Sequence, residues 1–122
     1  MKKINLADKF EKFNEYWSPR IICELNNQYV KLAKFKGEMI WHSHDNEDEF
    51  FQVIKGAIKI HFRDKTIELN EGECAVVPKG VEHKPEAASE EAYVLFFEPR
   101  ETTHTGSTIC ELTKEISQQP WI

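Results

Sequence analysis

The sequence lacks the features that mark a secreted or a membrane-embedded protein. Its three cysteines, Cys23, Cys74 and Cys110, are odd in number, widely spaced and without a C-x-x-C pair, which favours reduced thiols over a disulfide framework. No run of about 20 apolar residues is present, and no long apolar stretch follows the lysines near the start, so we expect neither a membrane span nor a secretory signal. These absences predict a cytoplasmic protein with no membrane partner.

Clustered positive charge is also missing. The chain has 16 lysines and arginines against 21 aspartates and glutamates, a formal net charge of −5, and its basic residues are scattered. A nucleic-acid backbone is bound by a concentrated basic face, so we expect no nucleic-acid partner. With 122 residues, of which 40% are hydrophobic, the chain fits one globular domain.

One segment, residues 5–17, has a helical pattern. Its apolar side chains recur with helical spacing as Leu6, Phe10, Phe13 and Trp17, which predicts one apolar stripe. Asn5 is the expected N-cap, and Pro19 would end the helix. We therefore expect residues 1–27 to form a short N-terminal helix and a lead-in, packed on the rest of the domain or across a dimer seam.

Residues 28–98 have the pattern of short strands instead. Residues 57–63 alternate apolar and polar side chains, and residues 49–54, 74–77 and 92–97 are rich in β-branched and aromatic types. The sequence has no glycine-rich phosphate loop and no long crossover helix, which are the features that would favour an α/β fold. The prediction is therefore an all-β sandwich or barrel. Residues 99–122 are predicted to be a polar C-terminal tail on the surface.

Four residues of this region have the spacing of a metal site. His42 and His44 are separated by one residue, so on a strand their side chains leave the same face, with Cα atoms about 6.6 Å apart. Residues 45–48 read as a turn, after which Glu49 starts a strand that could return antiparallel to the histidines. His83 follows a later turn and could face the same interior. Three imidazoles and one carboxylate suit one divalent transition metal, Fe, Mn, Ni, Cu or Zn, in an open site.

The spacing of these residues resembles two motifs of the cupin superfamily. Residues 37–56 read G, four residues, H-x-H, four residues, E, six residues, G, and residues 72–83 read G, five residues, P-x-G, two residues, H. The first motif of cupins has one more residue after its opening glycine, and the second ends in an asparagine where this chain has Ala87. Neither departure falls on a predicted ligand.

The resemblance implies a cupin-type double-stranded β-helix, a jelly-roll barrel, over residues 28–98. It is strongest to the small single-domain cupins that are loosely grouped with mannose-6-phosphate isomerase. Such cupins are often homodimers, which implies a homodimer here, with the apolar stripe of the helix and outward residues such as Phe50 and Ile54 available for the seam.

The remaining residues near these motifs suggest an apolar pocket. If Glu49 points inward, Phe51 and Val53 follow with period two, and Ile40 and Val81 would accompany the histidines. We expect His61 on the outer face, His104 in the tail, and Glu38 and Glu47 at the surface. No lysine or arginine can be placed inward from the sequence.

Three functions are compatible with this pattern, each with a small-molecule substrate or ligand. The first is a metal-dependent enzyme acting on a small organic acid or diketone, because the ligand set resembles that of cupin dioxygenases. The second is a sugar-phosphate isomerase of the mannose-6-phosphate isomerase type, which would need cations in the pocket. The third is a non-catalytic metal- or ligand-binding protein or sensor. No second acid or base stands out, so the catalytic residues stay unassigned.

Overall fold

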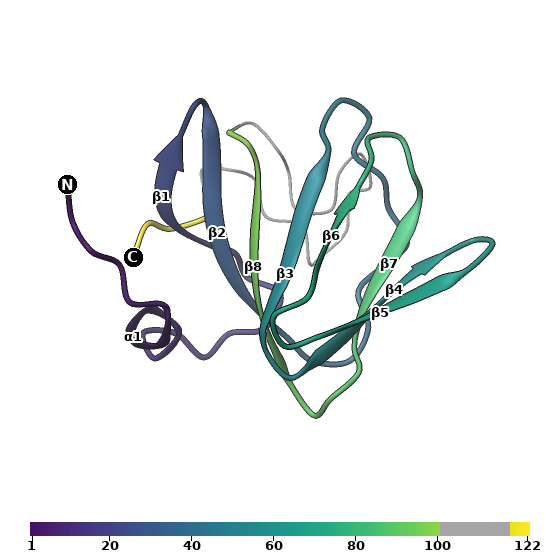
Figure 1. Ribbon diagram of the computed structural model, residues 1–122, viewed down its shortest axis with the longest axis horizontal. Coiled ribbons are helices and arrows are strands. Elements are labelled where there is room, and N and C mark those ends of the chain that lie inside the picture. Colours follow the sequence, from purple (N-terminus) through teal and green to yellow (C-terminus); the bar gives the residue numbers. More distant parts are fainter. Residues whose placement is uncertain (101–117) are drawn as a thin grey trace.

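The computed structural model describes residues 1–100 and 118–122, which form one short helix and a set of antiparallel strands (Figure 1). In chain order the elements are α1 (Leu6–Phe10), β1 (Arg20–Leu25), β2 (Gln28–Phe35), β3 (Glu49–Lys55), β4 (Ala57–Phe62), β5 (Thr66–Asn70), β6 (Cys74–Val77), β7 (His83–Ala87) and β8 (Ala92–Pro99).

The strands build two sheets that share one core. The larger sheet has the order β1-β2-β8-β3-β6 and the smaller one the order β5-β4-β7. β8 lies between β2 and β3 and pairs antiparallel with both, although it is the last of these strands in the sequence. This topology of two antiparallel sheets around one core confirms the predicted all-β jelly-roll fold.

Side-chain alternation explains how the two sheets pack. In β4, Ile58 and Ile60 point into the core and are fully buried, as the period-two pattern predicts. In β8 every second residue, from Ala92 to Glu98, is buried in the same way. The core between the sheets therefore consists of the inward rows of both sheets.

The N-terminal helix is shorter than its apolar stripe predicts, and the prediction of a helix through Trp17 is wrong. α1 starts at the predicted cap, where the Asn5 side chain accepts a hydrogen bond from the Asp8 backbone, but it ends at Phe10. Phe10 and Phe13 pack on the outer face of the larger sheet. Trp17 instead joins the core between the sheets, stacks on Phe35 with ring centroids 4.2 Å apart, and donates from Nε1 to the Lys36 carbonyl oxygen. Burying the indole in the core outweighs the weak preference for two more helical turns.

The larger sheet extends beyond the strand region predicted from the sequence. β1 precedes residue 28 and pairs with β2. The last residues, 118–122, return to β1 (Figure 1), where the Ile21 N–H donates to the Pro120 carbonyl and the Ile122 N–H donates to the Ile21 carbonyl. Part of the predicted surface tail thus lies along the sheet. The division of the chain at residues 28 and 98 stays a prediction.

Candidate metal centre

His42 and His83 are held beside each other by their backbones. The N–H of each donates to the carbonyl oxygen of the other, at 2.9 and 2.8 Å. His83 begins β7, and the segment from Met39 to His44 runs antiparallel to it, with Met39 N–H bonded to the Pro85 carbonyl. This segment continues the smaller sheet past β7, which gives the predicted H-x-H pair a strand-like backbone and a common face.

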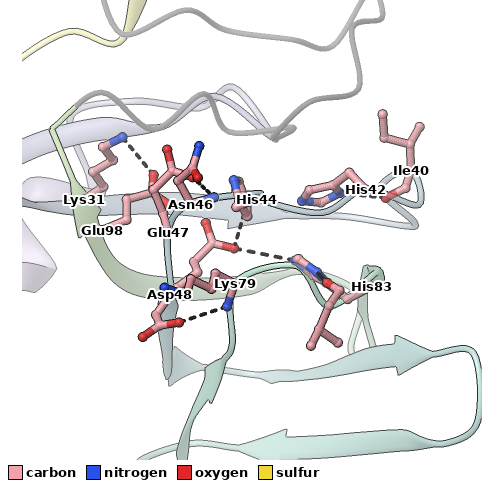
Figure 2. Close-up of polar contacts among 12 residues, drawn as sticks. Lys31, Ile40, His42, His44, Asn46, Glu47, Asp48, Lys79, His83 and Glu98 are labelled. Carbon is pink, nitrogen blue, oxygen red and sulfur yellow. Dashed lines mark hydrogen bonds and ion pairs between the residues drawn. The ribbon is translucent and has the colours of Figure 1, made fainter.

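Two loop contacts fix the remaining geometry of this segment. The Gly80 N–H donates to the His44 carbonyl oxygen at 2.8 Å, and the Lys79 N–H donates to the Asp48 carboxylate at 2.9 Å (Figure 2). These two hydrogen bonds therefore connect the turn that precedes His83 to both ends of the turn that follows His44. Glu49 then starts β3 in the opposite sheet, opposite Val77 of β6.

The ring orientations leave the Nε2 atoms free to meet. His42 Nδ1 lies 2.9 Å from the Ile40 carbonyl oxygen, and His83 Nδ1 lies 2.9 Å from the Val81 carbonyl oxygen. A carbonyl oxygen only accepts, so each Nδ1 carries the proton and each Nε2 keeps its lone pair. Backbone oxygens that orient a ring in this way are typical of metal-binding histidines.

All four predicted residues converge. One nitrogen from each histidine and one Glu49 oxygen lie within 4.8 Å of one another, and all four residues are buried. His44 Nε2 and His83 Nε2 lie 3.3 and 3.6 Å from Glu49 Oε1 (Figure 2). These three atoms have no other partner among the described residues, an arrangement that costs free energy unless something else binds them. The donor set therefore fits a divalent transition metal, which would be held by these four side chains.

The protonation states of the cluster also suit a cation. Burial lowers the pKa of His42 to about 4, assisted by the neighbouring His83. Burial alone would raise the pKa of Glu49, but its polar interactions with Glu98, His44 and His83 hold it well below its ordinary value. Burial would lower the pKa of His44, whereas its hydrogen bond to Glu49 raises it overall. At neutral pH, His42 is neutral and Glu49 is ionised, as metal binding requires.

Two charged residues that were not predicted from the sequence lie close to Glu49. Lys31 in β2 and Glu98 in β8 are both fully buried, and Lys31 Nζ lies 2.8 Å from Glu98 Oε1 (Figure 2). Burial, together with the charge of the neighbouring Glu49 carboxylate, holds the pKa of Glu98 well above its ordinary value. Of the two carboxyl groups, Glu98 therefore takes up a proton more readily than Glu49.

A signal for both residues is present in the sequence. Glu98 continues the inward row of Ala92, Val94 and Phe96, and Lys31 continues that of Ala33 and Phe35. Extending period two through a charged residue would have placed each inside.

An apolar pocket opens beside the cluster. It measures about 30 Å³, and its walls include Trp17, Phe35, Met39, Phe51 and Phe96. Of the four cluster residues, His42 and Glu49 face it. Phe51 lines the pocket as expected, whereas Val53 is buried elsewhere in the core, and Ile40 and Val81 only pack against that core.

The other described residues considered from the sequence are not members of the cluster. His61 hydrogen-bonds with Thr66 and Glu86 on the outer face of the smaller sheet. Glu38 is largely exposed and pairs with Lys84, and Glu47 is half-buried. His104 lies outside the described residues.

A jelly roll with three histidines and one glutamate between its sheets is the architecture of a cupin. Residues 29–106 match the cupin domain model, so this chain belongs to the cupin domain family.

Similar solved structures support that assignment. A cupin-2 domain containing protein from Shewanella frigidimarina is 52% identical, with a TM-score of 0.77, over 80% of this chain and 94% of that one. The protein NMB1881 from Neisseria meningitidis is 31% identical, with a TM-score of 0.73, over 80% of this chain and 99% of that one.

A curated relative matches a smaller part. The uncharacterised protein YdbB from Bacillus subtilis is 42% identical over 64 residues, which span 52% of this chain and 57% of that protein.

Proposed function

We propose that this cupin binds one divalent transition metal through His42, His44, Glu49 and His83 and acts on a small organic substrate beside it. The observation that carries the proposal is the convergence of three imidazoles and one carboxylate within 4.8 Å in a buried position. A bound ion would supply a Lewis acid or a redox centre.

The chain's own residues have defined tasks in this proposal. The Ile40 and Val81 carbonyls hold the His42 and His83 rings in the ligand orientation. Glu49 offsets part of the cation's charge, and the aromatic walls of the pocket exclude water from the side that a substrate would approach.

The pocket lining weighs against the sugar-phosphate isomerase. Among the described residues, no lysine or arginine lines the pocket beside the cluster, and Lys31, the nearby buried cation, is paired with Glu98. A phosphate group would have no cationic partner there. A non-catalytic metal- or ligand-binding role stays the second candidate, and the small volume of the pocket supports it.

Metal content of the His83→Ala variant tests the proposed ligand set. We expect the wild-type chain to retain about one ion after dialysis, and His83→Ala to lose most of it, because one of four ligands is missing. His61→Ala is the matched control, since His61 lies outside the cluster. Elemental analysis measures the ion, and circular dichroism should show an unchanged β-sheet spectrum. Full metal occupancy in His83→Ala would remove that residue from the ligand set.

Turnover separates an enzyme from a binding protein. Oxygen uptake by the Fe(II), Ni(II) or Cu(II) protein with small organic acids and diketones would favour the enzyme. Failure of every such metal with every candidate would favour the non-catalytic role.

The predictions about partners and location stay open. Of the described residues, no helix is long and apolar enough to cross a membrane. The homodimer, the absence of a nucleic-acid partner and the cytoplasmic location stay predictions.

A further inference from the structure

We infer that the pocket beside the cluster binds a short aliphatic chain that carries a single oxygen-donor head group, such as a carboxylate. This inference rests on the proposed function, because the head group would bind the metal. The size, polarity and charge of the pocket define the substrate class.

The volume of the pocket limits the length of the ligand. The pocket volume of about 30 Å³ corresponds to roughly two water molecules, since one water needs about 10–15 Å³ on the same measure. Drug-sized ligands occupy about 300–1,000 Å³ pockets. The tail of a ligand that enters this space is therefore only a few carbon atoms long.

Polarity sets the second limit. Apart from His42 and Glu49, every described residue that lines the pocket is apolar, among them Trp17, Phe35, Met39, Phe51 and Phe96. The Trp17 Nε1 donor is already bonded to the Lys36 carbonyl. A hydroxyl on the buried tail would lose its water without gaining a partner, which is costly. The tail is therefore hydrocarbon and unlike a sugar.

The charge of the lining residues and the position of the cluster limit the number of anionic groups on the ligand. The cluster meets the pocket only at His42 and Glu49, so a ligand in the pocket reaches the metal with one end. The rest of the described lining is apolar, so it offers no cation to a second anionic group. A monocarboxylate satisfies both ends, whereas a dicarboxylate buries an unpaired charge.

Titration of the Co(II)-loaded protein with linear carboxylates tests the inference. Formate, acetate, propionate, butyrate and hexanoate are added in turn, and dissociation constants come from the visible spectrum and from calorimetry. We expect about fourfold tighter binding for each methylene that enters the pocket, followed by a decline at hexanoate. Succinate, which matches butyrate in chain length, should bind at least tenfold more weakly than butyrate.

Variants that change the pocket volume make the test specific. Ala33 lines the pocket, so Ala33→Val should reduce its volume and shift the tightest binding to a shorter carboxylate. Met39→Ala should enlarge the pocket and shift the tightest binding to a longer carboxylate. Ala75→Val is the matched control, because Ala75 packs against the same core but does not line the pocket. If one of the two pocket variants fails to fold, circular dichroism detects the failure. The other variant still shows whether the preferred chain length of the carboxylate changes.

The outcomes separate the two proposals. Protein that binds Co(II) but shows no dependence on chain length, or prefers succinate to butyrate, overturns the inference alone. Protein that binds no Co(II) or other transition metal overturns the proposed function, and the inference with it.

Discussion

Inside the jelly roll, Lys31 and Glu98 depart furthest from apolar packing. Neither side chain reaches solvent, their charged atoms lie 2.8 Å apart, and Glu98 contacts the Glu49 carboxylate. The desolvation of a buried ion pair largely offsets its attraction. We therefore expect the intact pair to add little to the free energy of unfolding.

Removing one member of this pair should be worse than removing both. Lys31→Met leaves two buried carboxylates without their cation, so we expect a loss of about 3–5 kcal/mol in the free energy of unfolding. The double variant Lys31→Met, Glu98→Leu should recover most of that loss. Urea denaturation measures both, with Lys84→Met, which removes a surface ion pair, as a control that changes little. Equal losses in the single and double variants would contradict the coupling.

The same side chains show what sequence reasoning can find at this scale. The spacing of His42, His44, Glu49 and His83, taken together, is typical of one kind of site, and it predicts the convergence of these side chains. Lys31 and Glu98 have no such spacing. A charged residue in a strand is ordinarily exposed. Lys31 and Glu98 can be buried because each has the other as an oppositely charged partner, and the two lie on strands that are distant in the sequence.

At the scale of the element, patterns predict the strands better than their ends. The alternation of β4 predicted the inward positions of Ile58 and Ile60 correctly, because it reflects the two-sided geometry of a strand. The N-terminal stripe predicted too long a helix, since its spacing cannot distinguish Phe10 and Phe13, which pack on the outer face, from Trp17, which packs inside. That choice depends on tertiary contacts with Phe35.

The turn between β3 and β4 should be intolerant of any side chain. Gly56 has φ +80°, and a Cβ there would collide with Ser89 Oγ and lie 2.6 Å from the Glu91 carbonyl oxygen. Gly72 has almost the same φ, +82°, but open space around it. We expect Gly72→Ala to cost about 1–2 kcal/mol through backbone strain alone, and Gly56→Ala to cost clearly more. Thermal unfolding of the two variants measures the difference, and equal melting temperatures would refute the steric account.

At the scale of the whole molecule, the buried histidines link stability to pH. With its pKa at about 4, His42 stays neutral in the folded protein at pH values where an unfolded chain, with a pKa near 6.5, gains a proton. This residue therefore lowers the free energy of unfolding as the pH falls from about 6.5 to about 4, by about 3 kcal/mol. His44, whose pKa is raised, acts in the opposite sense, and its contribution is lost as the pH rises above 6.5.

Comparison with His42→Asn isolates the contribution of His42. Asparagine can still donate a hydrogen bond to the Ile40 carbonyl but does not titrate. In metal-free protein, prepared with a chelator, we expect the variant to lose stability less steeply than the wild type between pH 6.5 and pH 4. Urea unfolding at several pH values gives the slopes, and identical slopes would contradict the neutral state of His42.

Trp17 lies twelve residues before the stretch that matches the cupin domain, yet it forms part of the wall that a ligand would touch. A protein reduced to its matched region would keep the four candidate ligands and lose an interior surface. Ligand preference can therefore diverge between relatives through residues that an alignment of their shared domain leaves out.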